Sequence, residues 1–317
     1  MSDILFSAPF SFIKKDIRKI KNKKYLFKEI WSKDELFYSR KIKVWIVNPG
    51  QKFIIDKKIL NFFPNLQIIA SPSTGSNHVD LKDCKSKKIK FYSLLNNRKR
   101  LSDIRASSEF TFLLILNSLR KIQNLKNEIL NSNWRDNEDD LRGYELYKKK
   151  VGIIGLGRIG GNVASWCKAF GSEVSYYDPF KKIKKFKKTN LKNIFKKSDI
   201  VVVSPILNNF TKQMINLSYF NLMKKNSHLV NTSRGEVLNQ EDLINFLSKS
   251  KKNITFSCDV LANEVKGKPL NKKLIKLYNN NKLFITPHIA GATYESQIKA
   301  SEIVIDMINK FYEKKKN

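Results

Sequence analysis

Short apolar runs alternate with longer segments of mixed character along most of the chain. Early runs at 43–47 and 66–70 each lead into a loop rich in Pro, Gly, Ser or Asn, and a third ends near Ser93. Later runs occur at 151–154, 173–177, 199–203, 228–231, 254–259 and 283–286. Runs of this length are typical of strands that are buried on both faces of a parallel sheet and separated by helices. The pattern therefore predicts two α/β domains.

The longest apolar-periodic stretch, residues 102–131, predicts a single connecting helix, and a second long stretch predicts a C-terminal helix at 294–311. The connecting helix has more apolar residues than one stripe needs. They are Phe110, Phe112, Leu113, Leu114, Ile115 and Leu116. Such a helix can lie between two domains of one chain or in the interface of a homodimer.

Glycines at a characteristic spacing follow the strand at 151–154. Gly155 would allow a tight turn, Gly157 a close approach of the backbone to a pyrophosphate, and Gly160 close packing of the next helix on the strand. The N-terminus of that helix, predicted at 162–170, would point at the phosphates.

The following strand, at 173–177, ends on Asp178, where a carboxylate can accept hydrogen bonds from both ribose hydroxyls of NAD. Strand, turn, helix, strand and acid thus occur in the order of a Rossmann domain that binds NAD in preference to NADP. Because about 150 residues precede it, we expect this domain to be inserted into another one.

The net charge of +33 raises the possibility of a nucleic-acid-binding protein. However, 51 of the 61 basic residues are Lys and only 10 are Arg, and they are spread along the whole chain. Base readout and phosphate binding favour Arg, so we expect no specific nucleic-acid partner.

The sequence lacks the usual features of membrane-bound, exported and metal-binding proteins. No apolar run approaches the roughly 20 residues that span a bilayer, and the N-terminus lacks the basic start of a signal peptide. Cys84, Cys167 and Cys258 have neither metal-binding nor redox spacing. We expect a cytoplasmic protein with reduced thiols, no metal site and no membrane contact.

Ligands of parallel sheets bind beyond the carboxyl ends of the strands. The polar residues expected there include Thr74, Ser204, Thr232, Arg234, Asp259 and His288. Arg234 could hold a carboxylate through paired hydrogen bonds, and His288, followed by Gly291, could act as an acid or base near neutral pH. Each of these residue types is also common in purely structural roles. His78 could touch a ligand or cap a helix.

Several segments form a pattern together: Ser73–Gly75 with Asp80, Ala106–Glu109, the glycine turn with Asp178, Asn231–Gly235, Asp259 with Glu264, and Thr286–Gly291. Through these segments, from about residue 43 to the end, the chain resembles the D-isomer-specific 2-hydroxyacid dehydrogenases, the family of the glycerate and phosphoglycerate dehydrogenases. We expect it to lack an additional C-terminal regulatory domain.

The resemblance implies a flavodoxin-like substrate domain (1–104 with 289–317), an inserted Rossmann domain (105–288) and an active site in the cleft between them. It implies a catalytic trio of Arg234, Glu264 and His288, and binding of a substrate carboxylate by the backbone amides of Thr74 and Gly75. The residues that we expect at the NAD site are Gly155, Gly157, Arg158, Ile159, Gly160, Asp178, Ser204, Thr232, Asp259 and Gly291.

Two departures from the family pattern affect the site. Residues 204–208 read Ser-Pro-Ile-Leu-Asn, which leaves the contacts of that loop with the nicotinamide side open. The segment after Arg234 is about one residue longer than usual, so Asn263 competes with Glu264 for the catalytic position. The distance from Asp259 favours Glu264.

We therefore expect NAD-dependent interconversion of a 2-oxo acid and an (R)-2-hydroxy acid, in a homodimer like its relatives. Arg98 and Arg100, in a loop predicted at 96–101, would suit a phosphorylated or sugar-derived acid, although a solvated basic loop is an equal alternative. The other function considered is an NAD(H)-sensing scaffold of the same fold without turnover.

Overall fold

The chain forms two compact units. The computed structural model describes residues 3–9, 11, 25–122, 125–132, 134, 138–267 and 269–313. Unit 1 comprises Met1–Ile104, Val265–Gly267 and Ala292–Asn317, and unit 2 comprises Arg105–Glu264 and Lys268–Gly291. The last crossing between the units therefore falls after Gly291 rather than after His288, and a short segment following Glu264 belongs to unit 1.

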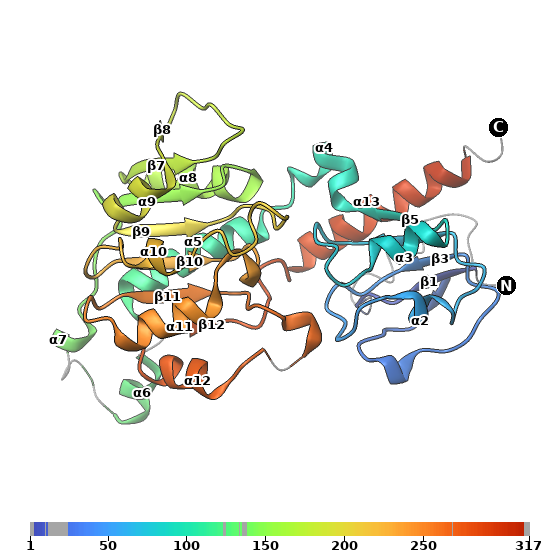
Figure 1. Ribbon diagram of the computed structural model, residues 1–317, viewed down its shortest axis with the longest axis horizontal. Coiled ribbons are helices and arrows are strands. Elements are labelled where there is room, and N and C mark those ends of the chain that lie inside the picture. Colours follow the sequence, from blue (N-terminus) through green and yellow to red (C-terminus); the bar gives the residue numbers. More distant parts are fainter. Residues whose placement is uncertain are drawn as a thin grey trace. The chain divides into compact units, whose positions relative to one another are not determined.

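Unit 1 contains a five-stranded parallel sheet (Figure 1). Its strand order is β2 (Tyr25–Phe27), β1 (Ile4–Phe6), β3 (Val44–Ile46), β4 (Ile68–Ser71) and β5 (Lys90–Ser93). The first two strands lie in the part of the sequence where no strand was predicted. Each has only three residues, which is too short to show a periodicity.

Apolar side chains cover both faces of this sheet. Those of β1, β3 and β4 alternate between two core clusters. One includes apolar residues of the C-terminal helix, and the other includes those of the helices at Lys57–Leu60 and Leu81–Ser86. The helices and helical turns of unit 1 are η1 (Lys33–Glu35), α2 (Lys57–Leu60), α3 (Leu81–Ser86), η2 (Leu94–Asn97), α4 (Arg98–Leu101) and α13 (Tyr294–Glu313).

Unit 2 contains a seven-stranded parallel sheet. Its order is β12 (Leu283–Ile285), β11 (Thr255–Cys258), β10 (His228–Asn231), β9 (Ile200–Val203), β6 (Lys150–Ile154), β7 (Glu173–Tyr177) and β8 (Lys187–Lys188). The central strand β9 is fully buried, as its uninterrupted apolar run predicts, and β10 is also fully buried although it begins with His228 and ends with Asn231. Two parallel-sheet α/β units, one of them with Rossmann order around β6, confirm the predicted fold class.

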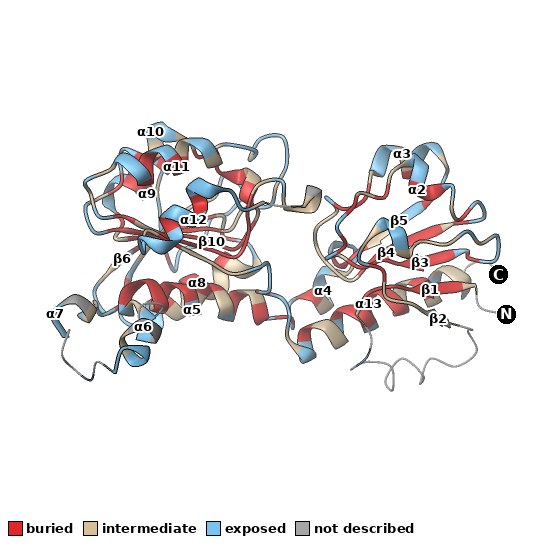
Figure 2. Cartoon of the chain, turned by 90° about the horizontal axis from the view of Figure 1, so that it is seen from below, coloured by how far each residue is buried: buried red, intermediate tan, exposed pale blue. Residues whose placement is uncertain are grey.

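Helices cover both faces of this second sheet, and their buried sides face the strands (Figure 2). One face carries α5 (Ala106–Arg120) and α8 (Arg158–Ala169). The other carries α9 (Leu191–Lys197), α10 (Leu217–Phe220), α11 (Gln240–Lys249) and α12 (Lys272–Asn279). The remaining elements are α6 (Leu125–Leu130), α7 (Glu138–Leu141), η4 (Gly235–Val237) and η5 (Glu264–Lys266).

The prediction of one helix over 102–131 is wrong in its extent. Helix α5 ends at Arg120, because Lys121 adopts a left-handed conformation (φ 53°) that closes the helix. Of the six apolar residues singled out above, all except Leu113 are buried or partly buried in the core of unit 2, and Leu113 is 51% exposed. Most of this apolar surface is therefore used within the unit.

Candidate active site

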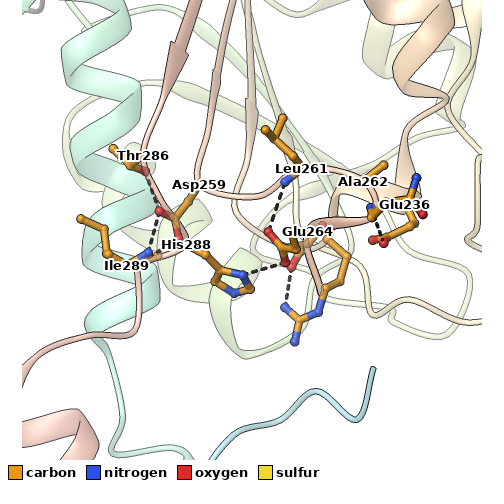
Figure 3. Close-up of polar contacts among 12 residues, drawn as sticks. Glu236, Asp259, Leu261, Ala262, Glu264, Thr286, His288 and Ile289 are labelled. Carbon is orange, nitrogen blue, oxygen red and sulfur yellow. Dashed lines mark hydrogen bonds and ion pairs between the residues drawn. The ribbon is translucent and has the colours of Figure 1, made fainter. Parts of the chain in front are cut away.

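A histidine and a glutamate meet at the carboxyl edge of the unit 2 sheet. His288 follows β12, and Glu264 lies in η5 after β11. The Nδ1 atom of His288 is 2.7 Å from Oε1 of Glu264 (Figure 3). The imidazole is 45% exposed and the glutamate only 16%. The structure thus places Glu264, and not Asn263, against the histidine.

Asp259, at the end of β11, holds the segment that carries His288. Its side chain is buried. Oδ1 accepts hydrogen bonds from Thr286 Oγ1 (2.5 Å) and the Ile289 amide (2.9 Å), and Oδ2 accepts one from the Ala290 amide (2.8 Å) (Figure 3). Sequence reasoning placed Asp259 at NAD and missed these bonds, which hold the Thr286 side chain before His288 and the backbone after it.

Arg234 follows β10, in a turn that is fixed by its own neighbours. The Asn231 amide group donates to the carbonyl oxygen of Arg234 (3.0 Å), and Arg234 Nη1 donates to that of Ser233 (2.6 Å). Burial lowers the pKa of Arg234, whereas the carboxylates of Glu264 and Glu236 act in the opposite direction. A guanidinium, a carboxylate and an imidazole thus come from the ends of three neighbouring strands.

The glycine turn after β6 fits a bound dinucleotide. Gly155 has φ +85°, and a Cβ on Gly160 would lie 2.1 Å from the Gly155 carbonyl oxygen, so both positions require glycine. Among the described residues, a Cβ on Gly157 would meet nothing within 4 Å. This open space lies at the N-terminus of α8, where no side chain caps the helix amides. Such amides are suited to a pyrophosphate.

Asp178 lies at the end of β7, as expected. Its Oδ2 accepts a hydrogen bond from the Leu156 amide (2.8 Å), and Oδ1 accepts two from the amides of Phe180 (2.9 Å) and Lys181 (3.1 Å). Because a carboxylate has about four acceptor positions, one remains beside the glycine turn. Phe180 itself is 92% exposed, and Ile206, after β9 on the other side of β6, is 70% exposed. These apolar side chains, which sequence reasoning missed, could cover an adenine ring.

Ser204 and Thr232, both expected at NAD, bond other protein groups in the structure, and Gly291 has no close neighbour in the described part of the chain that requires a glycine. Ser204 Oγ donates to the carbonyl oxygens of Ile154 (3.1 Å) and Gly155 (2.9 Å), which holds the glycine turn. The buried hydroxyl of Thr232 is 2.6 Å from that of Thr111 on α5. A Cβ on Gly291 would make only an ordinary contact, so the backbone does not require glycine there. Arg158 and Ile159 begin α8 and are partly buried.

The expected carboxylate-binding residues Thr74 and Gly75 belong to unit 1, in the loop after β4. Ser73 Oγ donates to the Gly75 carbonyl oxygen (3.1 Å) and is 2.9 Å from Ser71 Oγ. Ser71 Oγ is in turn 3.0 Å from Nε2 of His78, which is 1% exposed. His78 therefore supports this loop. The helix-capping role considered for it is wrong, because the Asp80 side chain caps α3.

The loop predicted at 96–101 is helical, being formed by η2 and α4. Arg98 is exposed, whereas Arg100 pairs with Asp306 and Glu302 of α13. Two carboxylates thus already neutralise one of the two arginines proposed to bind a second anionic group.

The described part of the chain contains no group of three or more His, Cys, Asp or Glu side chains that could hold a metal ion. All three cysteines are buried, and burial raises the pKa of Cys84 to about 11 and that of Cys167 to about 12. They are poor nucleophiles for that reason. No helix in the described segments is long and apolar enough to cross a membrane.

Comparisons with known proteins agree with this geometry. The family model for the NAD-binding domain of D-isomer specific 2-hydroxyacid dehydrogenases matches residues 112–290. A glyoxylate reductase from Thermofilum pendens is 32% identical over 257 residues, which covers 78% of this chain and 73% of the relative. The glyoxylate reductase of Pyrococcus horikoshii is 29% identical over 260 residues, covering 79% and 74%.

A solved structure resembles the whole chain. The D-lactate dehydrogenase of Aquifex aeolicus, crystallised with NAD and lactic acid, superimposes with a TM-score of 0.81 at 26% identity. The match covers 98% of this chain and 95% of that one.

Proposed function

The chain belongs to the D-isomer specific 2-hydroxyacid dehydrogenases, and we propose that it reduces a small 2-oxo acid to the (R)-2-hydroxy acid with Arg234, Glu264 and His288 as its catalytic residues. NAD is the cofactor of this family. The observation that carries the assignment of the residues is the 2.7 Å contact between His288 and Glu264, next to an arginine whose charge the same glutamate stabilises.

The three side chains have different roles in the proposed reaction. Arg234 binds the substrate carboxylate and polarises the ketone oxygen through its guanidinium N–H groups. His288 donates a proton to that oxygen as it becomes an alkoxide, for which its exposed imidazole is suited. Glu264 orients the imidazole and balances its charge when it is protonated. NAD, when bound, supplies the hydride acceptor or donor.

The binding residues divide between cofactor and substrate. The amides at the start of α8, around Gly157, would hold the pyrophosphate, and Asp178 a ribose hydroxyl. Phe180 and Ile206 would lie against the adenine. We assign the substrate carboxylate to Arg234, and the amides of Thr74 and Gly75 are the further carboxylate-binding groups that the family resemblance implies. A phosphorylated or larger acid is the less favoured substrate, because Arg100 already has carboxylate partners.

A panel of 2-oxo acids tests this proposal. Purified protein is mixed with NADH and glyoxylate, pyruvate, or phosphorylated and sugar-derived 2-oxo acids, and NADH oxidation is followed by absorbance. We expect the highest kcat/KM for a small acid and an (R)-configured product where the product is chiral. Tight NADH binding without turnover of any acid would instead indicate a sensing scaffold. A strong preference for a phosphorylated acid would restore the anion-binding role of Arg98 and Arg100.

A further inference from the structure

The segment that carries Glu264 rests directly on the turn after Arg234. An added Cβ on Gly235 would lie 2.0 Å from the carbonyl carbon of Leu261 and 2.2 Å from the nitrogen of Ala262. Real Cβ atoms do not approach backbone atoms this closely. The two backbones therefore touch at Gly235, and the position of one segment determines that of the other.

Two side chains from the Arg234 side also bind this segment. Oε1 of Gln240, at the start of α11, accepts the Ala262 amide hydrogen (2.8 Å), and Oε1 of Glu236 in η4 accepts that of Asn263 (3.1 Å). Glu236 lies beside Ala262 (Figure 3). Both acceptors precede the strand β11 in the sequence, so they tie the Glu264 segment to a separate part of unit 2.

The segment needs such support because of its backbone conformation. Asn263, immediately before Glu264, has φ 62°, in the left-handed region that is uncommon for residues other than glycine. Its amide and that of Ala262 must both find acceptors in this geometry. A further bond in the turn, from the Leu261 amide to Glu264 Oε2, is long at 3.4 Å. Glu236 and Gln240 therefore satisfy the two backbone amides that directly precede Glu264.

We propose that Glu236 and Gln240 are positioning residues for catalysis, which hold Glu264 at the distance at which it bonds His288. This inference rests on the proposed function, because it assumes that the Glu264–His288 pair takes part in turnover. Neither residue needs to contact substrate or cofactor in this role. Each acts by accepting one backbone hydrogen bond of the Glu264 segment.

Alanine and glutamine variants separate the acceptor from other properties of the side chain. We expect Glu236→Ala and Gln240→Ala to lower kcat about tenfold, the effect of losing one well-formed hydrogen bond, with the Kd of NADH changed less than twofold. Glu236→Gln keeps an acceptor oxygen and should retain at least about a third of the kcat. Glu241→Ala, at an exposed neighbouring position of α11, is the matched control and should have full activity.

A double-mutant cycle tests whether Glu236 acts through Glu264. In a Glu264→Ala background the positioned group is gone, so the additional change Glu236→Ala should alter the remaining kcat less than twofold. A general structural role would instead lower kcat by the same factor in both backgrounds. Thermal unfolding of every variant identifies those that do not fold. If Glu236→Ala does not fold, the kcat values of Glu236→Gln and Gln240→Ala decide the test instead.

The outcomes distinguish this inference from the proposed function. If Glu264→Ala has wild-type kcat, the proposed catalytic trio is wrong. If Glu264→Ala is impaired but Glu236→Ala and Gln240→Ala keep kcat within twofold, only the positioning role is wrong. Equal losses in Glu236→Gln and Glu236→Ala would also overturn it, since charge and not the acceptor would then be required.

Discussion

His288 and Glu264 differ in their access to solvent. The imidazole can exchange protons with a substrate at the surface, while the largely buried carboxylate faces the ring and the guanidinium of Arg234. This difference in exposure is the reason that we assign the proton transfer to His288 and the orienting role to Glu264. Substitutions of the two residues should therefore have different effects.

Replacing His288 by alanine should remove the proton donor and leave the cofactor site in place. We expect kcat to fall by about 100-fold or more, the range of general acid catalysis, and the Kd of NADH to change less than twofold. Steady-state kinetics and a fluorescence titration with NADH measure the two quantities. A His288→Ala enzyme with near wild-type kcat would refute the proposed mechanism.

Glu264→Gln should have a smaller effect, because an amide oxygen can still bond the imidazole but carries no charge. We expect partial activity, with a kcat between those of the wild type and His288→Ala, measured by steady-state kinetics. A wild-type kcat in Glu264→Gln would show that the charge of Glu264 does not influence the reaction.

His228 makes stability depend on pH. It begins β10, and its Nδ1 is 2.6 Å from Thr255 Oγ1, while Nε2 has no hydrogen-bond partner among the described residues. Burial, followed by the charge of Lys149, lowers the pKa of His228 from 6.5 to about 4, and Asp199 opposes the shift. The unfolded chain therefore binds a proton between these pH values that the folded chain does not.

Acidification should accordingly destabilise the fold. The contribution is fully present above pH 6.5 and is lost as the pH falls towards 4, to an extent of about 3 kcal/mol. Urea unfolding at pH 7.5 and pH 5 measures the change. In His228→Gln the difference between the two pH values should be smaller, and an equal difference would exclude His228 as its cause.

At the scale of elements, the junction of β6 and α8 has two adjacent glycines with different surroundings. A Cβ on Gly160 meets the Gly155 carbonyl oxygen and Ser204 Oγ, whereas one on Gly161 meets nothing within 4 Å. Close packing of strand, turn and helix thus constrains the first position only.

This difference gives a matched pair of substitutions. Gly160→Ala should lower the Tm and weaken NADH binding at least tenfold, because the clash displaces the turn that receives the pyrophosphate. Gly161→Ala should leave binding unchanged and stabilise α8 by up to about 1 kcal/mol through helix propensity. Similar effects of both substitutions would show that helix propensity, and not packing, governs this junction.

The element α4 supports a prediction about Arg100. Its pairs with α13 involve side chains that are 39% to 52% exposed, so Arg100→Ala should cost at most about 1 kcal/mol of stability. KM for a small 2-oxo acid should not change. A large rise in KM would instead show that Arg100 leaves its partners to bind substrate.

The elements also show where sequence reasoning succeeds. The strands of unit 2 other than β8 and the turn with Gly155 and Gly160 were predictable, because burial and close packing restrict the residues allowed there. The two exposed lysines of β8 give no such signal. The end of α5 was not, since Lys121 adopts its left-handed conformation without a glycine or proline to indicate it. The bonds of Asp259 and the support of the Glu264 segment depend on contacts between strand ends, which spacing along the chain does not reveal.

At the scale of the whole molecule, a surface of unit 2 suggests self-association. Beyond the packed part of α5, exposed apolar side chains continue through α6: Leu113, Ile122, Leu125, Ile129, Leu130 and Trp134. We infer that these side chains contribute to an interface. The sequence predicted a dimer through the helix at 102–131, and the structure moves the proposed contact towards the end of α5 and α6.

We expect a homodimer at micromolar concentration, measured as twice the monomer mass by light scattering. Ile129→Asp should give a monomer, because it places a charge in the proposed interface. Ile275→Asp, at a similarly exposed position of α12, should remain dimeric. A monomeric wild-type protein would reject the proposal.

The path of the chain also sets the order in which the units can be completed. Unit 2 is almost continuous, but the core of unit 1 joins strands from the first 93 residues to Ile303, Val304 and Ile308 of α13. On the ribosome, the core of unit 1 can be completed only after α13 has emerged. Unit 2, which is encoded between the two parts of unit 1, can already fold at that stage. During synthesis, unit 2 should therefore complete its fold before unit 1, although unit 1 begins first in the sequence.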